Sequence, residues 1–86
     1  MREPSRARYP HIVRNPRVLD GEPTIASTRV PVWVVVAAWR MRPDMAEMLA
    51  AYPMLTPSLV QEALAFAEDH PQEIEAALAE NAAETA

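Results

Sequence analysis

The sequence predicts a small, mostly α-helical domain: a short β-hairpin section, a bundle of three helices that contains a helix-turn-helix, and a fourth helix at the C-terminus. Three observations lead to this expectation. The chain has 86 residues and no cysteine, which suits one domain with a modest core. Its only glycine and two of its nine prolines fall within residues 20–32, where they indicate turns. Beyond this stretch, apolar side chains recur at helical spacing between prolines and capping residues.

The composition divides the chain into three parts. Residues 1–10 contain three arginines and two prolines and are expected to have nothing to bury, so we expect a flexible basic arm. They lack the apolar core of a signal peptide. Residues 11–70 are expected to form the folded domain, and residues 71–86 an acidic C-terminal helix or tail.

The domain is expected to begin with a β-hairpin. Asp20-Gly21 stands between the apolar runs 17–19 and 24–26, and Asp-Gly in that position is a hairpin signal. Val30 precedes Pro31, which favours an extended backbone there, and proline suits the entry of a helix. Residues 20–32 are therefore interpreted as a structural corner between strand and helix.

The first helix is expected to run from Val32 to about Met41, and it has two apolar stripes. One stripe faces the core and contains Val32, Val35, Val36 and Trp39. The second contains Trp33, Ala37 and Met41, and a domain this small cannot cover both faces of the helix. Because small domains without disulfides commonly gain stability by association, the second stripe predicts a homodimer interface.

The later helices are marked by their caps. Asp44 and Glu47 have the spacing of a capping box, so a second helix follows Asp44 and ends before Pro53. Thr56 is the expected N-cap of the third helix, with Pro57 at its first position. Leu55 and Val60 then have the spacing of a hydrophobic staple. Pro71 begins the fourth helix.

The net charge of −4 conceals a sharp division along the chain. Residues 1–42 hold all eight arginines and only three acidic residues, a net charge of +5, whereas residues 43–86 hold nine acidic residues and no lysine or arginine. Such asymmetry suggests two surfaces with different partners. The alternatives are that the two halves attract each other or are merely solvated.

Little in the sequence points to catalysis, a metal or a membrane. His11 and His70 stand far apart in the chain with no nucleophile in a recognisable arrangement, and Ser27 and Thr28 fall in a tight turn, where hydroxyls commonly form local hydrogen bonds. With no cysteine and two histidines, no metal site or cofactor is expected. The longest apolar run is about half of a transmembrane span. We therefore expect a cytoplasmic protein that is not an enzyme.

The second and third helices, joined by residues 53–55, resemble a helix-turn-helix, which is a DNA-reading motif. The chemistry of the would-be recognition helix disagrees, because its polar residues are Ser58, Gln61, Glu62, Glu68 and Asp69. Carboxylates repel phosphates. If DNA is bound, the predicted contacts are Arg6, Arg8, Arg14 and Arg17.

Several segments together resemble the family called domain of unknown function 433. They are the run NPRVLDGEPTIASTRVPVWVVV, the pair Tyr52-Pro53, the Leu-Thr that follows, and the helix ALAFAED. The similarity covers about residues 9 to 70. It implies a homeodomain-like trihelical fold preceded by a β section, usually dimeric, and a VapB-like antitoxin encoded beside a PIN-like toxin. The family favours glycine where Ser27 stands and a basic residue where Glu22 stands.

The resemblance implies an antitoxin that binds and inhibits a PIN-like nuclease, with operator DNA as a further option. The alternative is a dimeric DNA-binding transcription regulator without a toxin. PIN-like nucleases are expected to hold a metal ion with clustered carboxylates, where a guanidinium would compete. The toxin contacts predicted on this basis are Arg29 and, in the C-terminal segment, Ile74 and Leu78. That segment is either a solvated terminus or a helix that orders against a partner.

Overall fold

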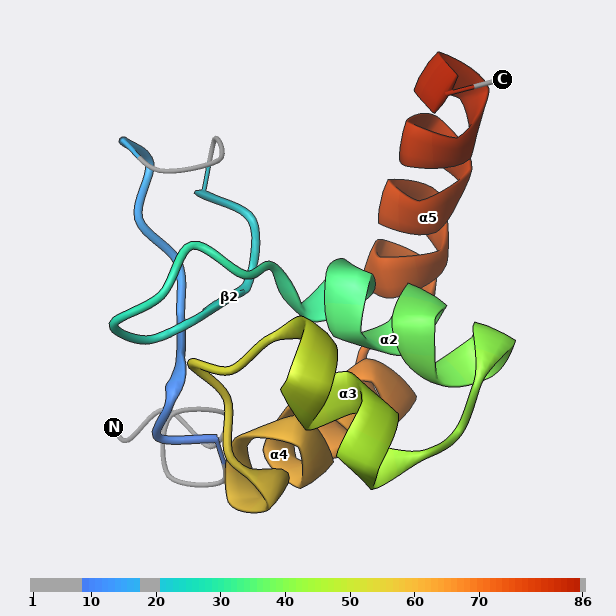
Figure 1. Cartoon of the computed structure of the whole chain (residues 1–86). Coiled ribbons are helices and arrows are strands. Elements are labelled where there is room, and N and C mark those ends of the chain that lie inside the picture. The colour runs from blue at the N-terminus through green and yellow to red at the C-terminus, as the bar shows by residue number, and fades with distance from the viewer. Residues whose placement is uncertain (1–8, 18–20, 86) are drawn as a thin grey trace.

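The structure is a computed structural model that describes residues 9–17 and 21–85, with side chains through residue 81. Two short strands precede four helices in the described residues (Figure 1). The strands are β1 (Ile12–Val13) and β2 (Thr24–Ile25), and the helices are α2 (Val32–Met41), α3 (Met45–Ala51), α4 (Pro57–Asp69) and α5 (Pro71–Thr85). The expected mostly helical fold with a leading β section and a fourth C-terminal helix is confirmed.

The β section pairs differently from the expected hairpin. β1 and β2 are antiparallel, with Ile12 opposite Ile25 and Val13 opposite Thr24. The prediction that residues 17–19 pair with 24–26 was therefore wrong, although residues 18–19 themselves lie outside the described part. The Asp-Gly signal identified a turn conformation correctly, because Gly21 has a φ of 80°. It could not identify the partner strand, whose register packs the partly buried Ile12 against the fully buried Ile25.

The corner before α2 is closed by local hydrogen bonds. The Thr28 hydroxyl donates to the carbonyl of Ile25 (2.7 Å) and accepts from the Val30 amide (3.0 Å). Ser27 has a φ of 66°, a left-handed conformation that favours glycine. Ser27 thus adopts the turn conformation for which the family described above favours glycine, and this strains its backbone.

The predicted helix boundaries and N-caps are confirmed, but the capping box at Asp44 is only half formed, because the Asp44 amide donates to the Arg42 carbonyl (2.8 Å) and the Glu47 carboxylate pairs with Arg42 instead. α2 has the bounds expected from the sequence. The Asp44 side chain accepts from the Glu47 amide (3.1 Å), and the Thr56 hydroxyl accepts from the Leu59 amide (3.2 Å), so each cap satisfies an amide that has no partner within its helix. Pro31 and Pro71 stand at the starts expected for α2 and α5.

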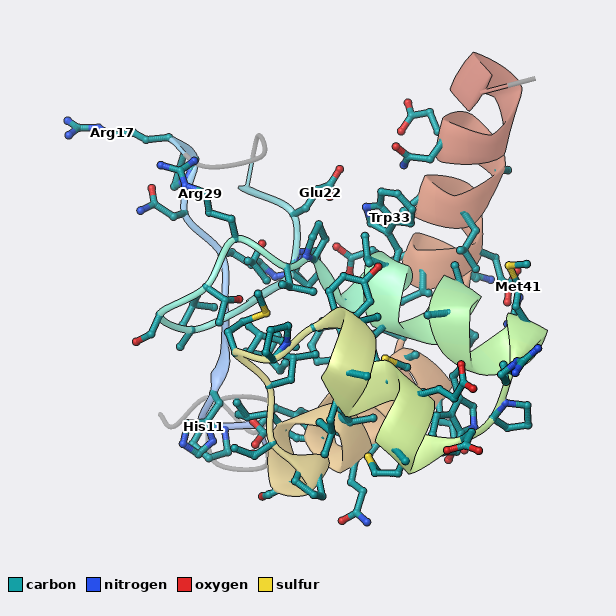
Figure 2. All side chains as sticks on the ribbon, viewed as in Figure 1. His11, Arg17, Glu22, Arg29, Trp33 and Met41 are labelled. Atoms are coloured by element: carbon teal, nitrogen blue, oxygen red, sulfur yellow. The ribbon has the colours of Figure 1, made fainter. Side chains whose placement is uncertain are left out.

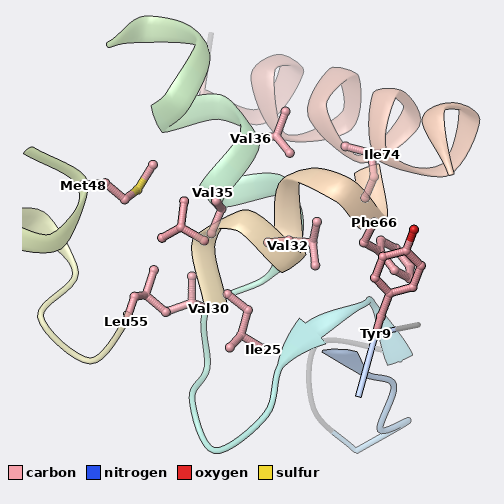
Figure 3. Close-up of a cluster of buried hydrophobic side chains, with 12 residues drawn as sticks. Tyr9, Ile25, Val30, Val32, Val35, Val36, Met48, Leu55, Phe66 and Ile74 are labelled. Carbon is pink, nitrogen blue, oxygen red and sulfur yellow. The ribbon is translucent and has the colours of Figure 1, made fainter. Parts of the chain in front are cut away.

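The core lies where α2 crosses α4, and α5 closes one side of it (Figure 3). Val32, Val35 and Val36 of the first predicted stripe are buried, together with Ile74 of α5, which is 2% exposed. The first turns of α5 pack beside α2, while its C-terminal end extends away from the bundle (Figure 1). α5 is therefore an ordered part of this fold through Ile74.

Tyr9 also belongs to the core, contrary to the expectation that residues 1–10 have nothing to bury. Its side chain is 6% exposed and meets the Phe66 ring edge-on, with ring centroids 5.3 Å apart. Its hydroxyl donates to the Asp69 carboxylate near the end of α4. A tyrosine buries a large apolar ring while its hydroxyl finds a polar partner, so it anchors the chain at residue 9.

Candidate functional site

The arginines show how the basic and acidic halves of the chain meet. Three of the five arginines in the described residues form ion pairs with carboxylates from the acidic half: Arg14 with Glu73, Arg40 with Glu75, and Arg42 with Glu47. Attraction between the two halves therefore accounts for part of the charge asymmetry. The surface available to a partner must be sought among the remaining arginines.

Arg14 connects the β section to α5 through an ion pair. Its guanidinium donates two hydrogen bonds to Glu73, one of them 2.8 Å long, and lies 5.8 Å from the centroid of the Phe66 ring. The hydrogen bond from Arg14 is the main cause that lowers the pKa of the Glu73 carboxyl below its ordinary value. A predicted DNA contact at Arg14 would have to compete with this pair.

Arg17 and Arg29 are exposed, and neither has an ion-pair partner among residues 9–17 and 21–81. Both extend from the β section on the same side of the view in Figure 2. Arg29 lines a shallow hollow with Ser27, Thr28 and Met54, and Met54 is 51% exposed. We call Arg17, Ser27, Thr28, Arg29 and Met54 the β-section surface; it combines permanent positive charge with an exposed apolar side chain.

The other predicted contacts are dispersed. Arg6 and Arg8 lie outside the described residues. The prediction that Ile74 contacts a partner is wrong for this conformation, because Ile74 is buried in the chain's own core. Leu78 is partly buried against the same core. A partner that lies on α5 must use its outer side.

The three residues of the predicted dimer stripe on α2 differ in how exposed they are. Trp33 is half-buried, and its indole N–H donates to the Glu22 carboxylate (3.0 Å) near the start of the helix. Ala37 is half-buried, and Met41 at the far end is 88% exposed. Figure 2 shows Trp33 beside α5 and Met41 at the opposite end of α2. The homodimer stays a prediction, with Met41 as its most accessible residue.

The proposed recognition helix is partly covered. The backbone amide of His11 donates to the Glu62 carboxylate (2.7 Å), and the His11 ring nitrogen Nδ1 lies 2.9 Å from the other carboxylate oxygen. The Glu62 side chain is consequently only 12% exposed, not part of the open polar face that the sequence suggested. This contact and the Glu22–Trp33 bond join distant segments, and no local sequence signal marks either pair.

Both histidines contact other described residues. His11 pairs with Glu62, while the His70 ring stacks on Phe66 with centroids 4.1 Å apart and its Nδ1 lies 3.1 Å from the Phe66 carbonyl oxygen. Within the described residues, no cluster of three or more histidine or acidic side chains could hold a metal ion. In that same part of the chain, no helix has the length and apolar character that crossing a membrane requires.

Comparison with known proteins identifies the family. The sequence profile described as protein of unknown function (DUF433) matches residues 12–67. The crystal structure of a DUF433 member protein from Anabaena variabilis ATCC 29413 is similar, with 35% sequence identity and a TM-score of 0.75 over 80% of this chain and 68% of that one. No curated protein matched the chain. Because the profile covers more than half of the sequence and the similar crystal structure matches 80% of the chain at 35% identity, the chain belongs to the DUF433 family.

Proposed function

We propose that this protein is an antitoxin-like binding subunit that captures a PIN-like nuclease and inhibits it. The observation that supports the proposal is the β-section surface, where Arg17 and Arg29 are exposed and lack ion-pair partners among the described residues. Arginines elsewhere in the described chain pair with carboxylates of α3 or α5. The guanidiniums of Arg17 and Arg29, the latter beside the exposed Met54, form a surface suited to a partner that carries carboxylates and an apolar contact.

The inhibition would be electrostatic. A nuclease that holds its metal ion with clustered carboxylates offers paired oxygens, and a guanidinium binds such oxygens through two parallel hydrogen bonds. Its positive charge does not depend on pH in the working range. Arg29 or Arg17 would thus occupy the place of the metal ion. A histidine-based catalytic role is disfavoured, because His11 and His70 each have a structural partner.

The test uses a PIN-like nuclease encoded beside this gene. The purified nuclease is titrated with the full chain, and binding and RNA cleavage are measured separately. Arg29→Ala and Arg17→Ala are compared with Arg40→Ala, a control whose arginine is also exposed but lies on α2, outside the β-section surface, and pairs with Glu75. We expect a loss of affinity of about tenfold or more for a central arginine, as at other interface hot spots, and no change for the control.

The outcomes separate the mechanisms. Wild-type protein that neither binds nor inhibits the nuclease would refute the antitoxin proposal. Binding and inhibition that survive both arginine substitutions would keep the antitoxin but replace electrostatic competition by steric blocking of the RNA path. A tight complex that regains RNA cleavage only in Arg29→Ala would favour competition for the metal site.

A dimeric DNA-binding transcription regulator is the second candidate, because the same unpaired arginines suit phosphates. α4 contributes little to this alternative, since Glu62 is covered by His11 and Glu68 is acidic and exposed. Binding to the gene's own upstream DNA should weaken with salt, and the log–log slope should fall by about 0.9 for each phosphate contact removed. A gel shift abolished by Gln61→Ala but not by Arg17→Ala would instead assign the contact to α4.

A further inference from the structure

A groove lies between the end of the β section and the first half of α5. It has a volume of about 190 Å³ and is lined by Glu22, Pro23, Trp33, Glu73, Ile74, Ala76, Ala77 and Glu80. Most of these side chains are apolar, the charged ones are all carboxylates, and no basic side chain of the described residues lines the groove. We call this feature the α5 groove; it lies apart from the β-section surface and shares no residue with it.

The aromatic side chain of the groove is held in place. The indole N–H of Trp33 donates to the Glu22 carboxylate at 3.0 Å, and Figure 2 shows Trp33 between Glu22 and α5. Because this bond fixes one edge of the indole, its remaining half-buried surface lines the groove. An indole ring beside carboxylates attracts a cation through both the ring quadrupole and the negative charge.

The negative charge of the groove is only partly compensated. Glu73 is paired with Arg14, whereas Glu22 accepts a hydrogen bond from a neutral indole and has no ion-pair partner among the described residues. Glu80 is exposed and has no ion-pair partner among the described residues. Within the described part of the chain, the groove therefore offers two carboxylates without an ion-pair partner, Glu22 and Glu80, and one aromatic ring.

We propose that the α5 groove binds an arginine side chain of a partner protein. Pockets that enclose whole small molecules usually measure about 300–1,000 Å³, so a groove of about 190 Å³ suits one side chain of a larger partner. Arginine fits better than lysine, because a planar guanidinium stacks on an indole while donating two bonds to a carboxylate. The assignment of the occupant rests on the proposed function, which supplies a protein partner, and on charge complementarity.

The first experiment tests the chemistry of the groove in the full chain. Nα-acetyl-arginine amide is titrated while the indole N–H signals of Trp33 and Trp39 are followed by NMR. We expect a saturable shift of the Trp33 signal and none for Trp39, which does not line the groove. Glu80→Gln should weaken binding by about threefold, the size of one exposed charge interaction, and the matched control Glu68→Gln on α4 should not.

Three results of the titration would overturn the proposal at this stage: an unchanged Trp33 signal, equal shifts of the Trp33 and Trp39 signals, or the same Trp33 shift with acetyl-norleucine amide, a neutral analogue. A fourth is a shift of the Trp33 signal when Arg2, Arg6 and Arg8 are together replaced by glutamine without any added ligand, because the chain's own N-terminal arm would then be the occupant.

The second experiment uses the nuclease complex and distinguishes the two proposals. Glu80→Gln should weaken nuclease binding by about threefold or more in low salt, with the folded state checked by circular dichroism. Equal binding by wild type and Glu80→Gln would overturn the groove assignment and leave the antitoxin proposal intact. Arginine-dependent shifts of Trp33 with no nuclease binding would support the groove and refute the antitoxin proposal.

Discussion

The packing of α5 predicts a large loss of stability for Ile74→Ala. Ile74 is 2% exposed, and the substitution removes a buried side chain down to its Cβ. Losing three buried carbons costs about 2.4 kcal/mol at about 0.8 kcal/mol for each methylene. A residual cavity adds to this cost, so we expect a loss of about 3 kcal/mol, within the range of about 2–5 kcal/mol typical for such truncations. For a domain of 86 residues, that is a large share of a total of about 4–13 kcal/mol.

The measurement is urea unfolding followed by circular dichroism, which gives both the free energy of unfolding and its dependence on urea. The control is Ala79→Ser, an exposed position on the same helix, which should change stability by less than about 0.5 kcal/mol. An Ile74→Ala variant as stable as the control would refute our account. It would mean that α5 does not belong to the cooperative core, and that Ile74 could serve a partner after all.

Three further predictions follow from individual contacts. Ser27→Gly should raise the free energy of unfolding by about 1 kcal/mol and the melting temperature by about 4–8 °C, because it relieves a φ of 66°; a lower melting temperature would contradict the strain. Glu73 has a lowered pKa beside Arg14, so its stabilisation is present above its ordinary pKa of 4.5 and is lost as the pH falls through the lower value in the folded state. Glu73→Gln should therefore reduce the loss of unfolding free energy between pH 7 and pH 3 by at most about 1 kcal/mol, since the Glu73 and Arg14 side chains are both more than a third exposed. A pH profile equal to that of the wild type would argue against a stabilising Arg14–Glu73 pair. Met41→Asp should convert the expected homodimer to a folded monomer in sedimentation, because Met41 is 88% exposed and its loss leaves the core intact; a wild-type protein that already sediments as a monomer at micromolar concentration would refute the dimer.

The helices could be predicted because their signals are local. Asp44 and Thr56 each bond an amide three residues ahead, and Pro31 and Pro71 restrict the backbone at the residue itself. Such signals depend on a few neighbouring residues, and the structure has helices at the places they indicate. The partner of β2 could not be predicted in the same way, because pairing with Ile12 crosses more than ten residues. Its choice depends on which apolar side chain the finished core accepts.

The candidate surfaces were only partly predictable for the same reason. The sequence shows that the arginines gather in the first half of the chain, but not which of them meet carboxylates. Arg14 meets Glu73 across 59 positions, whereas Arg17, only three residues later, has no ion pair among the described residues. The hydrogen bond between Trp33 and Glu22 could not be predicted either, since neither residue type requires the other as a partner. Whether an arginine is available to a partner depends on whether the folded chain pairs it with one of its own carboxylates. The arginines without such a pair can therefore be identified as candidates only from the structure.

The docking of α5 determines how both proposed surfaces would operate. Within the described residues, two ion pairs join α5 to the rest of the chain, Arg14–Glu73 and Arg40–Glu75, but both are solvent-exposed and weaken with salt. The packing of the buried Ile74 side chain involves no charge, so salt does not screen it. High ionic strength should thus leave α5 in place and the α5 groove formed, while weakening any arginine bound in it. Because the groove exists before a partner arrives, binding there would not carry the entropy cost of ordering a disordered tail, and a loss of affinity in salt would report the charge contact itself rather than unfolding of α5.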